Sequence, residues 1–267
     1  MRRTSMFRQA LVAAIVALAC QAGPAFADPA ADTCAIHYPS DARIAWTCHR
    51  VTRGDTLASL FGKDWRDGLR FNRIDRRHVY PGVRLKVPVD PGELKDFTPL
   101  PASYEAAAGD AKFIFIDLSE QFLGAYAHGR LVMSFPISSG QASHPELHTP
   151  DGLFRVDAYD PRHESSVYDM EDSDRPYPMH YALRFLTTRQ GVEVWIHGRD
   201  LPGYPASHGC VGLYDEAMQK EYYGVPRHPQ LDAARRLYAW AIAPHPDDGH
   251  MHVIADGPPV LIVGRAP

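Results

Sequence analysis

The sequence predicts a mainly β protein, in which a β-rich domain with sandwich-like packing follows a small α+β unit. From residue 112 onward, short apolar runs alternate with turn residues, which is typical of the sheets of a β sandwich or barrel. Between residues 48 and 88 the pattern indicates strand, helix, helix and strand, the order of a small two-layer unit. With 267 residues, the chain is long enough for one large domain or two smaller ones.

The composition is that of an ordinary globular protein and argues against one class of partner. Apolar residues make up 45% of the chain and charged residues 22%. The net charge is −4 at pH 7, and no run of lysines and arginines is long enough to line a groove for a polyanion. We therefore expect no nucleic-acid partner. The composition does not indicate an oligomeric state.

The first 27 residues have the three parts of a secretory signal peptide. Three arginines within the first eight residues precede an apolar run over 11–22, and Ala25-Phe26-Ala27 forms an A-x-A cleavage site. The apolar run is too short for a membrane span, so we expect cleavage after Ala27 and no span in the mature chain. We expect export to the periplasm or cell wall. Lipidation at Cys20 stays open as an alternative.

Three cysteines remain after this cleavage, and an odd number is informative in an exported protein. A disulfide between Cys34 and Cys48 would close a short loop and stabilise the fold by roughly 3 kcal/mol, but the spacing leaves their pairing open. Such a bond would leave Cys210 as a free thiol in an oxidising compartment. A spare thiol is a liability there unless it is used, so Cys210 is a candidate reactive residue, with a buried inert thiol as the alternative.

The elements of the small unit follow from capping residues and apolar spacing. Val51 begins a short strand, and Asp55 or Thr56 caps a first helix. A second amphipathic helix covers 65–72, and the alternating stretch 83–88 forms a strand that ends at a proline.

These residues resemble a LysM domain. The resemblance is carried by Gly54-Asp55-Thr56-Leu57, by Asn72 and by Tyr80-Pro81-Gly82, which occur in the family's order. It implies a domain over 48–89 that binds glycans containing N-acetylglucosamine, such as peptidoglycan. The proline-rich residues 90–110 that follow form a linker or a packed extended arm, and both interpretations stay open.

The β-rich domain is expected over residues 111–265. Its strands are predicted at 113–118, 122–127, 131–137, 153–156, 179–185, 192–197, 253–254 and 260–263, with helices beginning near 214 and covering 231–242. The segment 161–178 is polar, acidic and rich in loop-forming residues. We expect it to be a loop, either a lid or a surface excursion.

The candidate chemistry lies where Cys210 follows two histidines. A thiol attacks only as the thiolate, and its ordinary pKa near 8.5 leaves only about a few per cent ionised at neutral pH. A histidine within hydrogen-bond reach can remove the proton. We expect this base to be His197, which ends a strand and is held rigidly, whereas His208 lies two residues before the thiol and points elsewhere if that segment is extended.

The residues around this pair supply further parts of an acyl-transfer site. Gly209 lets the backbone approach a substrate carbonyl, so the amides of Gly209 and Cys210 can form an oxyanion hole. The group that orients His197 is expected to be a backbone carbonyl such as that of Gly198, with Asp200 as a lesser alternative.

The β-rich domain resembles the L,D-transpeptidases, peptidoglycan cross-linking enzymes with a cysteine nucleophile and a β-rich fold. The resemblance is carried by His197-Gly198 and by Ser207-His208-Gly209-Cys210-Val211, with supporting marks at 117–121, 136–140 and 149–154. It implies Cys210 as nucleophile and His197 as general base. It also implies that His208 and Gly209 shape the oxyanion region and that Ser207 supports their loop.

The sequence departs from this family in two places. Gly212 stands where an arginine or asparagine is common, and the nine residues between His197 and Ser207 are fewer than usual. The first departure concerns how a substrate carboxylate or the loop is held. Tyr181, Arg184 and Arg199 are the candidates for binding the substrate.

The implied reaction begins with attack of the Cys210 thiolate on the third residue of a tetrapeptide stem, which releases D-alanine and forms a thioester. An amine acceptor then completes a cross-link or an attachment to a protein or amino acid; with water as acceptor, the enzyme is an L,D-carboxypeptidase. A non-catalytic peptidoglycan-binding protein is a further alternative, favoured only by Gly212.

No cofactor and no metal are expected. A zinc site built from His197, His208 and Cys210, or from the histidines of 245–252, is the remaining alternative, but neither set has a characteristic spacing.

Overall fold

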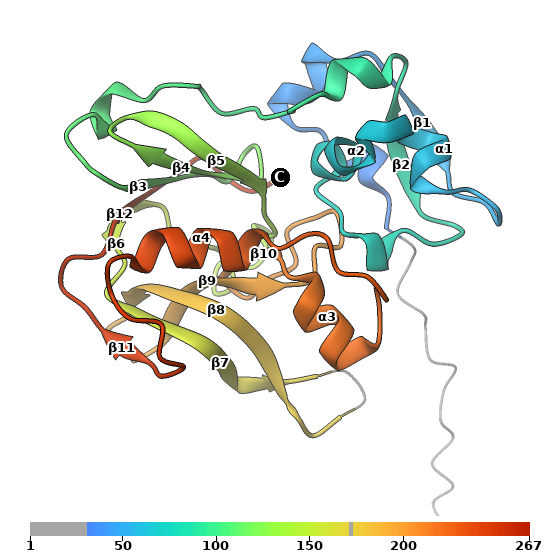
Figure 1. Cartoon of the computed structure of the whole chain (residues 1–267). Helices are drawn as coiled ribbons and strands as arrows, with labels where there is room; N and C mark the ends of the chain where they lie inside the picture. Colours follow the sequence, from blue (N-terminus) through green and yellow to red (C-terminus); the bar gives the residue numbers. More distant parts are fainter. Residues whose placement is uncertain (1–30, 171–172) are drawn as a thin grey trace, which may run out of the picture.

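The computed structural model describes residues 31–170 and 173–267, and Figure 1 shows a small unit, coloured blue to teal, packed beside two larger sheets. The predicted signal peptide at 1–27 and the alternative lipidation site Cys20 lie outside the described residues. Among the helices that are described, none is long and apolar enough to cross a membrane.

The small unit has the predicted order of strand, helix, helix and strand. Its elements are β1 (Trp46–Arg50), α1 (Leu57–Phe61), α2 (Trp65–Asn72) and β2 (Arg84–Pro88), with β1 antiparallel to β2. The predicted start of the first strand at Val51 is wrong. The strand lies before Val51, because the chain then turns through Gly54, whose φ of +104° favours glycine. Of the two candidate caps, Thr56 is the N-cap, and its hydroxyl accepts a hydrogen bond from the Ser59 amide at 3.0 Å.

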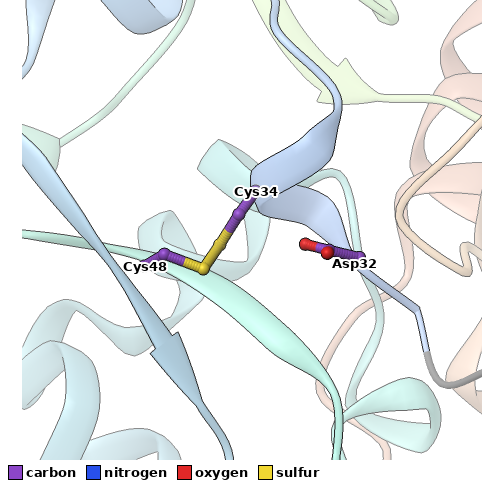
Figure 2. A group of neighbouring side chains, drawn as sticks. All are labelled: Asp32, Cys34 and Cys48. Atoms are coloured by element: carbon purple, nitrogen blue, oxygen red, sulfur yellow. A yellow bond between two sulfur atoms is a disulfide. The ribbon is translucent and has the colours of Figure 1, made fainter.

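A disulfide joins Cys34 to Cys48, with an S–S distance of 2.11 Å. It ties the 3-10 helix η1 (Thr33–Ala35) to β1, and Figure 2 shows Asp32 beside it. The pairing that the spacing left open is therefore present, and Cys210 is the free cysteine of the described residues. Because the two sulfur atoms bond to each other, this group is not a metal site although its ligand atoms lie close together.

Residues 90–110 pack against both parts of the chain. Phe97 is buried between Phe71 of α2 and Phe122, with ring centroids 5.2 and 5.8 Å away in edge-to-face arrangements. Leu100 joins the same apolar cluster. The remaining 3-10 helices are η2 (Pro39–Arg43), η3 (Gly62–Asp64), η4 (Arg76–His78), η5 (Pro91–Leu94) and η6 (Glu105–Ala107).

The rest of the chain forms two five-stranded sheets, which confirms the prediction of a mainly β fold. The first sheet, in spatial order, is β5 (Arg130–Pro136), β4 (Phe122–Ala127), β3 (Phe113–Asp117), β12 (Pro259–Val263) and β6 (Gly152–Arg155). The second is β10 (Val211–Tyr214), β9 (Glu193–Arg199), β8 (Pro176–Thr187), β7 (Ala158–Asp169) and β11 (His252–Val253). Neighbouring strands are antiparallel except for β12 with β3 and β10 with β9.

A single apolar core holds the two sheets together. Figure 1 shows α4 (Ala233–Ile242) running between them, while α3 (Glu216–Tyr223) lies at the end of the second sheet. The core takes Ile116 and Leu123 from the first sheet, Leu183 and Ile196 from the second, and Leu237 from α4. Because β9 and β10 contribute side chains to this core, both strands are held in place, and the candidate catalytic residues lie within β9 and directly before β10.

The prediction of a loop over 161–178 is wrong. Most of this segment belongs to β7 and β8, which form a long antiparallel hairpin with His163 opposite Met179. The outer part of the hairpin extends beyond the core, so its side chains are mostly exposed, and most of them are polar. The polar composition that indicates a loop is therefore the consequence of a strand pair that solvent surrounds.

Four buried charged side chains join the small unit to the first sheet: Asp41, Arg73, Lys86 and Glu120. We call them the inter-unit charge cluster. The Arg73 guanidinium lies 3.2 Å from the Glu120 carboxylate and 3.5 Å from Asp41, and it covers the Tyr38 ring at 3.9 Å. Lys86 pairs with Asp41. Each buried charge in this cluster therefore has a partner of opposite sign.

Candidate active site

Cys210 lies at the point where the chain enters β10, beside the parallel strand β9. Gly209 directly before it has a φ of +119°, a conformation that favours glycine and sets the angle at which the thiol enters the site. The thiol is half-buried and accepts a hydrogen bond from the Trp195 amide at 3.4 Å. The position of the sulfur therefore depends on the pairing of β9 with β10.

His197 is buried on β9, directly opposite Gly212 in the strand register. The strand continues for two residues beyond His197, so this histidine lies inside the strand rather than at its end. Its Nδ1 is 2.8 Å from the Gly198 carbonyl oxygen. A carbonyl only accepts, so Nδ1 carries the proton and Nε2 has the free electron pair of a base.

The resting protonation states follow from burial. Burial lowers the pKa of His197 to about 3, against the smaller opposing effect of the Gly198 carbonyl, so the ring is neutral at neutral pH. Burial raises the pKa of the Cys210 thiol, and the Trp195 amide and the Arg199 charge oppose this shift. The thiol makes its hydrogen bond with a backbone amide, not with a histidine. At rest the site therefore holds a protonated thiol and a neutral imidazole.

A hydrogen-bond network supports the segment that leads to the thiol. The buried Ser207 pairs with Ser139, its amide donating to the Ser139 carbonyl at 3.0 Å. The Thr149 hydroxyl donates to the Gly209 carbonyl at 2.8 Å and accepts from the Gly140 amide at 2.9 Å. These bonds give a structural reason for the two sequence marks at 136–140 and 149–154, because both stretches hold the loop in front of Cys210.

The third sequence mark, at 117–121, supports the same network indirectly, because its Gln121 bonds to Ser139 and not to the loop that carries Cys210. The Gln121 side chain donates to the Ser139 hydroxyl at 2.7 Å and accepts from the Ser139 amide at 3.0 Å. All of these groups are buried, so each bond replaces one that water would otherwise make.

His208 points away from the thiol segment and stacks on Tyr168, with ring centroids 4.3 Å apart and planes 13° apart. Tyr168 belongs to the outer part of the β7–β8 hairpin, so this hairpin covers one side of the loop that carries Cys210. Sequence analysis did not identify Tyr168, because no local signal links a hairpin tip to a residue 40 positions later. The role of Trp195 could not be predicted either, because its backbone amide, and not its side chain, donates to the thiol.

The three candidate substrate-binding residues lie in different surroundings. Tyr181 contacts the rings of Tyr238 and His180. Arg184 pairs with Asp157 at 2.8 Å and also with Glu193, so its charge is already compensated. The positive charge of Arg199 lowers the pKa of the thiol and of both histidines of the motif. Asp200, the lesser alternative for orienting His197, instead accepts a hydrogen bond from Gln219 at 2.9 Å.

Two groups of side chains in the described structure have potential metal ligands close together, and neither contains Cys210. One is the disulfide group described above. The other consists of Asp75, His78 and Asp200. The Asp75 carboxylate accepts hydrogen bonds from the amides of His78 and Leu201 and from the Gln219 side chain, which also donates to Asp200. The C-terminal histidines form separate pairs, His245 with Asp256 and His252 with Asp248.

Comparison with known proteins assigns residues 111–246 to a protein family. They match the model of the YkuD family, described as the L,D-transpeptidase catalytic domain. No curated protein matches the chain.

Several solved structures resemble the chain. An L,D-transpeptidase from Mycobacterium smegmatis is 19% identical over 57% of this chain and 58% of its own, with a TM-score of 0.37. L,D-transpeptidase 1 from Mycobacterium tuberculosis is 21% identical over 58% and 63%, with a TM-score of 0.35. An L,D-transpeptidase from Xylanimonas cellulosilytica is 22% identical over 82% and 98%, with a TM-score of 0.43. The chain thus spans about 60% of the length of the mycobacterial proteins.

Proposed function

The chain belongs to the YkuD family of L,D-transpeptidase catalytic domains, and we propose that it is a cysteine-dependent acyltransferase that acts on peptidoglycan stem peptides. The observation that carries the proposal is a free thiol, Cys210, directly before the strand that pairs with a buried histidine whose Nδ1 is bonded to a backbone carbonyl. This bond leaves Nε2 of His197 as an acceptor for the thiol proton.

The proposed reaction has two steps. His197 Nε2 takes the thiol proton, and the Cys210 sulfur attacks the carbonyl carbon of the third stem residue. The C–N bond breaks, the imidazolium returns its proton to the departing nitrogen, and D-alanine leaves behind a thioester. In the second step an acceptor amine attacks the thioester and loses a proton to His197, and Cys210 leaves as the thiol. The products are a new amide and the original enzyme.

The neighbours of Cys210 have supporting roles in this reaction. The amides of Gly209 and Cys210 stabilise the oxyanion, because the positive φ of Gly209 gives this stretch a turned backbone. Ser207 holds the loop through its pairing with Ser139, and His208 holds it through its stacking on Tyr168. In the resting state both reacting groups are neutral, so the transfer of the Cys210 proton to His197 accompanies attack on the bound substrate instead of preceding it.

The small unit is proposed to be a LysM domain that holds the enzyme on the glycan strands. Its strand, helix, helix and strand order supports this assignment together with the sequence resemblance. A cavity of about 280 Å³ is lined by the loop 51–57 and by Val79, Tyr80 and Pro81, which are the segments that carry the resemblance. A glycan bound there would keep stem peptides at a high local concentration for the catalytic domain.

Export to the periplasm or cell wall is part of the same proposal. The disulfide between Cys34 and Cys48 supports it, because such bonds persist in oxidising compartments. The peptidoglycan substrate lies in the same place.

The test is incubation of the purified protein with a disaccharide-tetrapeptide, followed by mass spectrometry. We expect loss of D-alanine, an adduct on Cys210 and a product that identifies the acceptor: a dimer with a second stem, or a tripeptide with water. Cys210→Ala should abolish both adduct and product. His197→Asn should slow turnover by roughly a hundred- to ten-thousandfold, whereas the matched control His245→Asn, in a surface pair with Asp256, should not.

Two outcomes would contradict the proposal. Turnover by Cys210→Ala would exclude the cysteine mechanism. The absence of adduct and product with the wild-type protein would favour a non-catalytic peptidoglycan-binding protein. Binding of purified glycan strands by the full-length chain, compared with Tyr80→Ala, tests the LysM assignment separately.

A further inference from the structure

Arg199 lies two residues beyond His197 on β9, so the two side chains share one face of the strand. The aliphatic stem of Arg199 runs across Gly212 on the neighbouring strand β10. A Cβ atom at position 212 would overlap both Cγ and Cδ of Arg199. The φ of Gly212 is not positive, so the backbone does not require glycine there. The glycine therefore provides the space through which the arginine reaches the site.

The Arg199 guanidinium has no carboxylate partner within ion-pair distance among the described residues, and its Nε is buried without a hydrogen bond. Other arginines of the fold are paired: Arg73 with Glu120, Arg76 with Glu216 and Arg184 with Asp157. The adjacent Asp200 faces Gln219 and Arg77 instead. A cation held in this way is a binding group for an anion that is not part of the chain.

The charge of Arg199 acts on the reacting groups. Burial raises the pKa of the Cys210 thiol, and Arg199 opposes that shift. Burial lowers the pKa of His208, and Arg199 lowers it further. The Arg199 stem crosses Gly212, which lies opposite His197 and two residues beyond Cys210, so an anion bound to the guanidinium would lie close to the scissile bond.

We propose that Arg199 is a specificity residue that binds the free carboxylate of the departing residue of the acyl donor. This inference rests on the proposed function, in which that residue is the terminal amino acid of the stem. Its carboxylate is attached to the carbon next to the departing nitrogen, so it lies a few bonds from the carbonyl that Cys210 attacks. The planar guanidinium matches a carboxylate with two parallel hydrogen bonds.

The consequence is selection for a chain end. A donor whose next residue continues into a longer peptide has no carboxylate at this position, and it would leave the Arg199 charge desolvated without a partner. Arg199 thus restricts the enzyme to removal of a terminal residue. Arg184, the other arginine candidate, cannot serve in this way while Asp157 and Glu193 hold it.

The first test does not depend on peptidoglycan chemistry. Iodoacetate and iodoacetamide alkylate the same thiol and differ in one negative charge. The ratio of the two alkylation rates on the protein is divided by the same ratio on a free thiol. For the wild-type protein we expect this quotient to favour iodoacetate by about ten- to a hundredfold, which is the effect of one charge-assisted hydrogen bond. Arg199→Gln should lose the preference and Arg199→Lys should keep part of it. The matched control Arg162→Gln, in an exposed pair with Glu221, should keep all of it.

The second test uses three forms of a tetrapeptide donor chosen to carry a side-chain carboxylate on its third residue: the free acid, the terminal carboxamide, and the form amidated on that side-chain carboxylate. We expect the terminal amide to lower kcat/KM of the wild-type protein by about ten- to a hundredfold and to have no further effect on Arg199→Gln. The side-chain amide should affect both proteins equally. Sensitivity of the wild-type protein to the side-chain amide alone would assign Arg199 to the other carboxylate and overturn this proposal.

The two tests separate the two ideas. An unchanged alkylation preference in Arg199→Gln, shown to be folded by its thermal unfolding, would overturn the anion site whether or not the protein is a transpeptidase. Failure of the wild-type protein to use any donor, with the alkylation preference intact, would contradict the proposed function and leave the anion site standing.

Discussion

Arg73 and Arg199 are both arginines in enclosed surroundings, and the protein treats them in opposite ways. All three guanidinium nitrogens of Arg73 donate hydrogen bonds, and two carboxylates of the inter-unit charge cluster compensate its charge. Arg199 has a buried Nε without a partner and no carboxylate within ion-pair distance in the described structure. Complete pairing makes a cluster that is costly to break and chemically inert. Incomplete pairing costs stability and leaves a group free to bind a ligand.

The same contrast holds for the groups around each arginine. In the charge cluster, Lys86 and Asp41 pair directly, and the Ser40 hydroxyl donates to Glu120 at 2.6 Å. In the candidate active site, His197 bonds to the backbone through Nδ1 and keeps Nε2 free, and the hydrogen bond of the Cys210 sulfur comes from a backbone amide. The charge cluster should therefore matter for stability alone, and the active site should matter for activity with smaller effects on stability.

The largest expected effect comes from removing Arg73. Arg73→Met leaves the carboxylates of Asp41 and Glu120 buried without their partner, which should lower the free energy of unfolding by about 3–5 kcal/mol. Arg84→Met is the matched control, because Arg84 forms a mostly exposed pair with Asp32 and should cost less than about 1 kcal/mol. Urea unfolding measures both. Equal losses in the two variants would contradict the assigned role of the charge cluster.

Gly212→Ala tests the space that Arg199 occupies in the candidate active site. The added methyl group overlaps the Arg199 stem, so we expect a loss of about 1–3 kcal/mol in unfolding free energy and a displaced guanidinium. Gly109→Ala is the matched control, because its Cβ would enter open space and its φ is not positive.

Arg199→Ala combined with Gly212→Ala should recover most of the lost stability, because the shortened side chain no longer meets the methyl group. The double variant should still lack the preference for iodoacetate. If the double variant instead lost as much unfolding free energy as the two single variants together, the two residues would not share this space.

The last expected effect is the pH dependence that His197 contributes, about 2 kcal/mol between pH 6.5 and pH 5. Its folded pKa of about 3 lies below its unfolded value of about 6.5, so the unfolded chain binds a proton that the folded protein does not. Stability should fall as the pH drops below about 6.5, by about 1.4 kcal/mol per unit until the folded pKa is reached. Urea unfolding of the wild-type protein and His197→Asn between pH 7.5 and 5 measures the difference. Parallel pH profiles would show that His197 is not buried as a neutral ring.

Much of the fold could be predicted because its signals are local. The order of the small unit and most strands of the two sheets follow from caps, turns and alternation. The loop predicted over 161–178 failed, because an outer hairpin exposes both faces and loses the apolar alternation of a strand. The prediction that a strand begins at Val51 was wrong because the residues that pair with β2 are Trp46–Arg50.

The residues of the candidate site also fall into those that local motifs predict and those that only the fold brings together. The family and the pair of Cys210 and His197 could be recognised without a structure, because their motifs are short stretches of chain. The expected bond between His197 and the Gly198 carbonyl is present, but only the folded chain shows that Tyr168 covers His208 and that Gly212 admits Arg199. These features depend on the parallel register of β9 with β10 and on packing between distant segments, and no local pattern of residues encodes them.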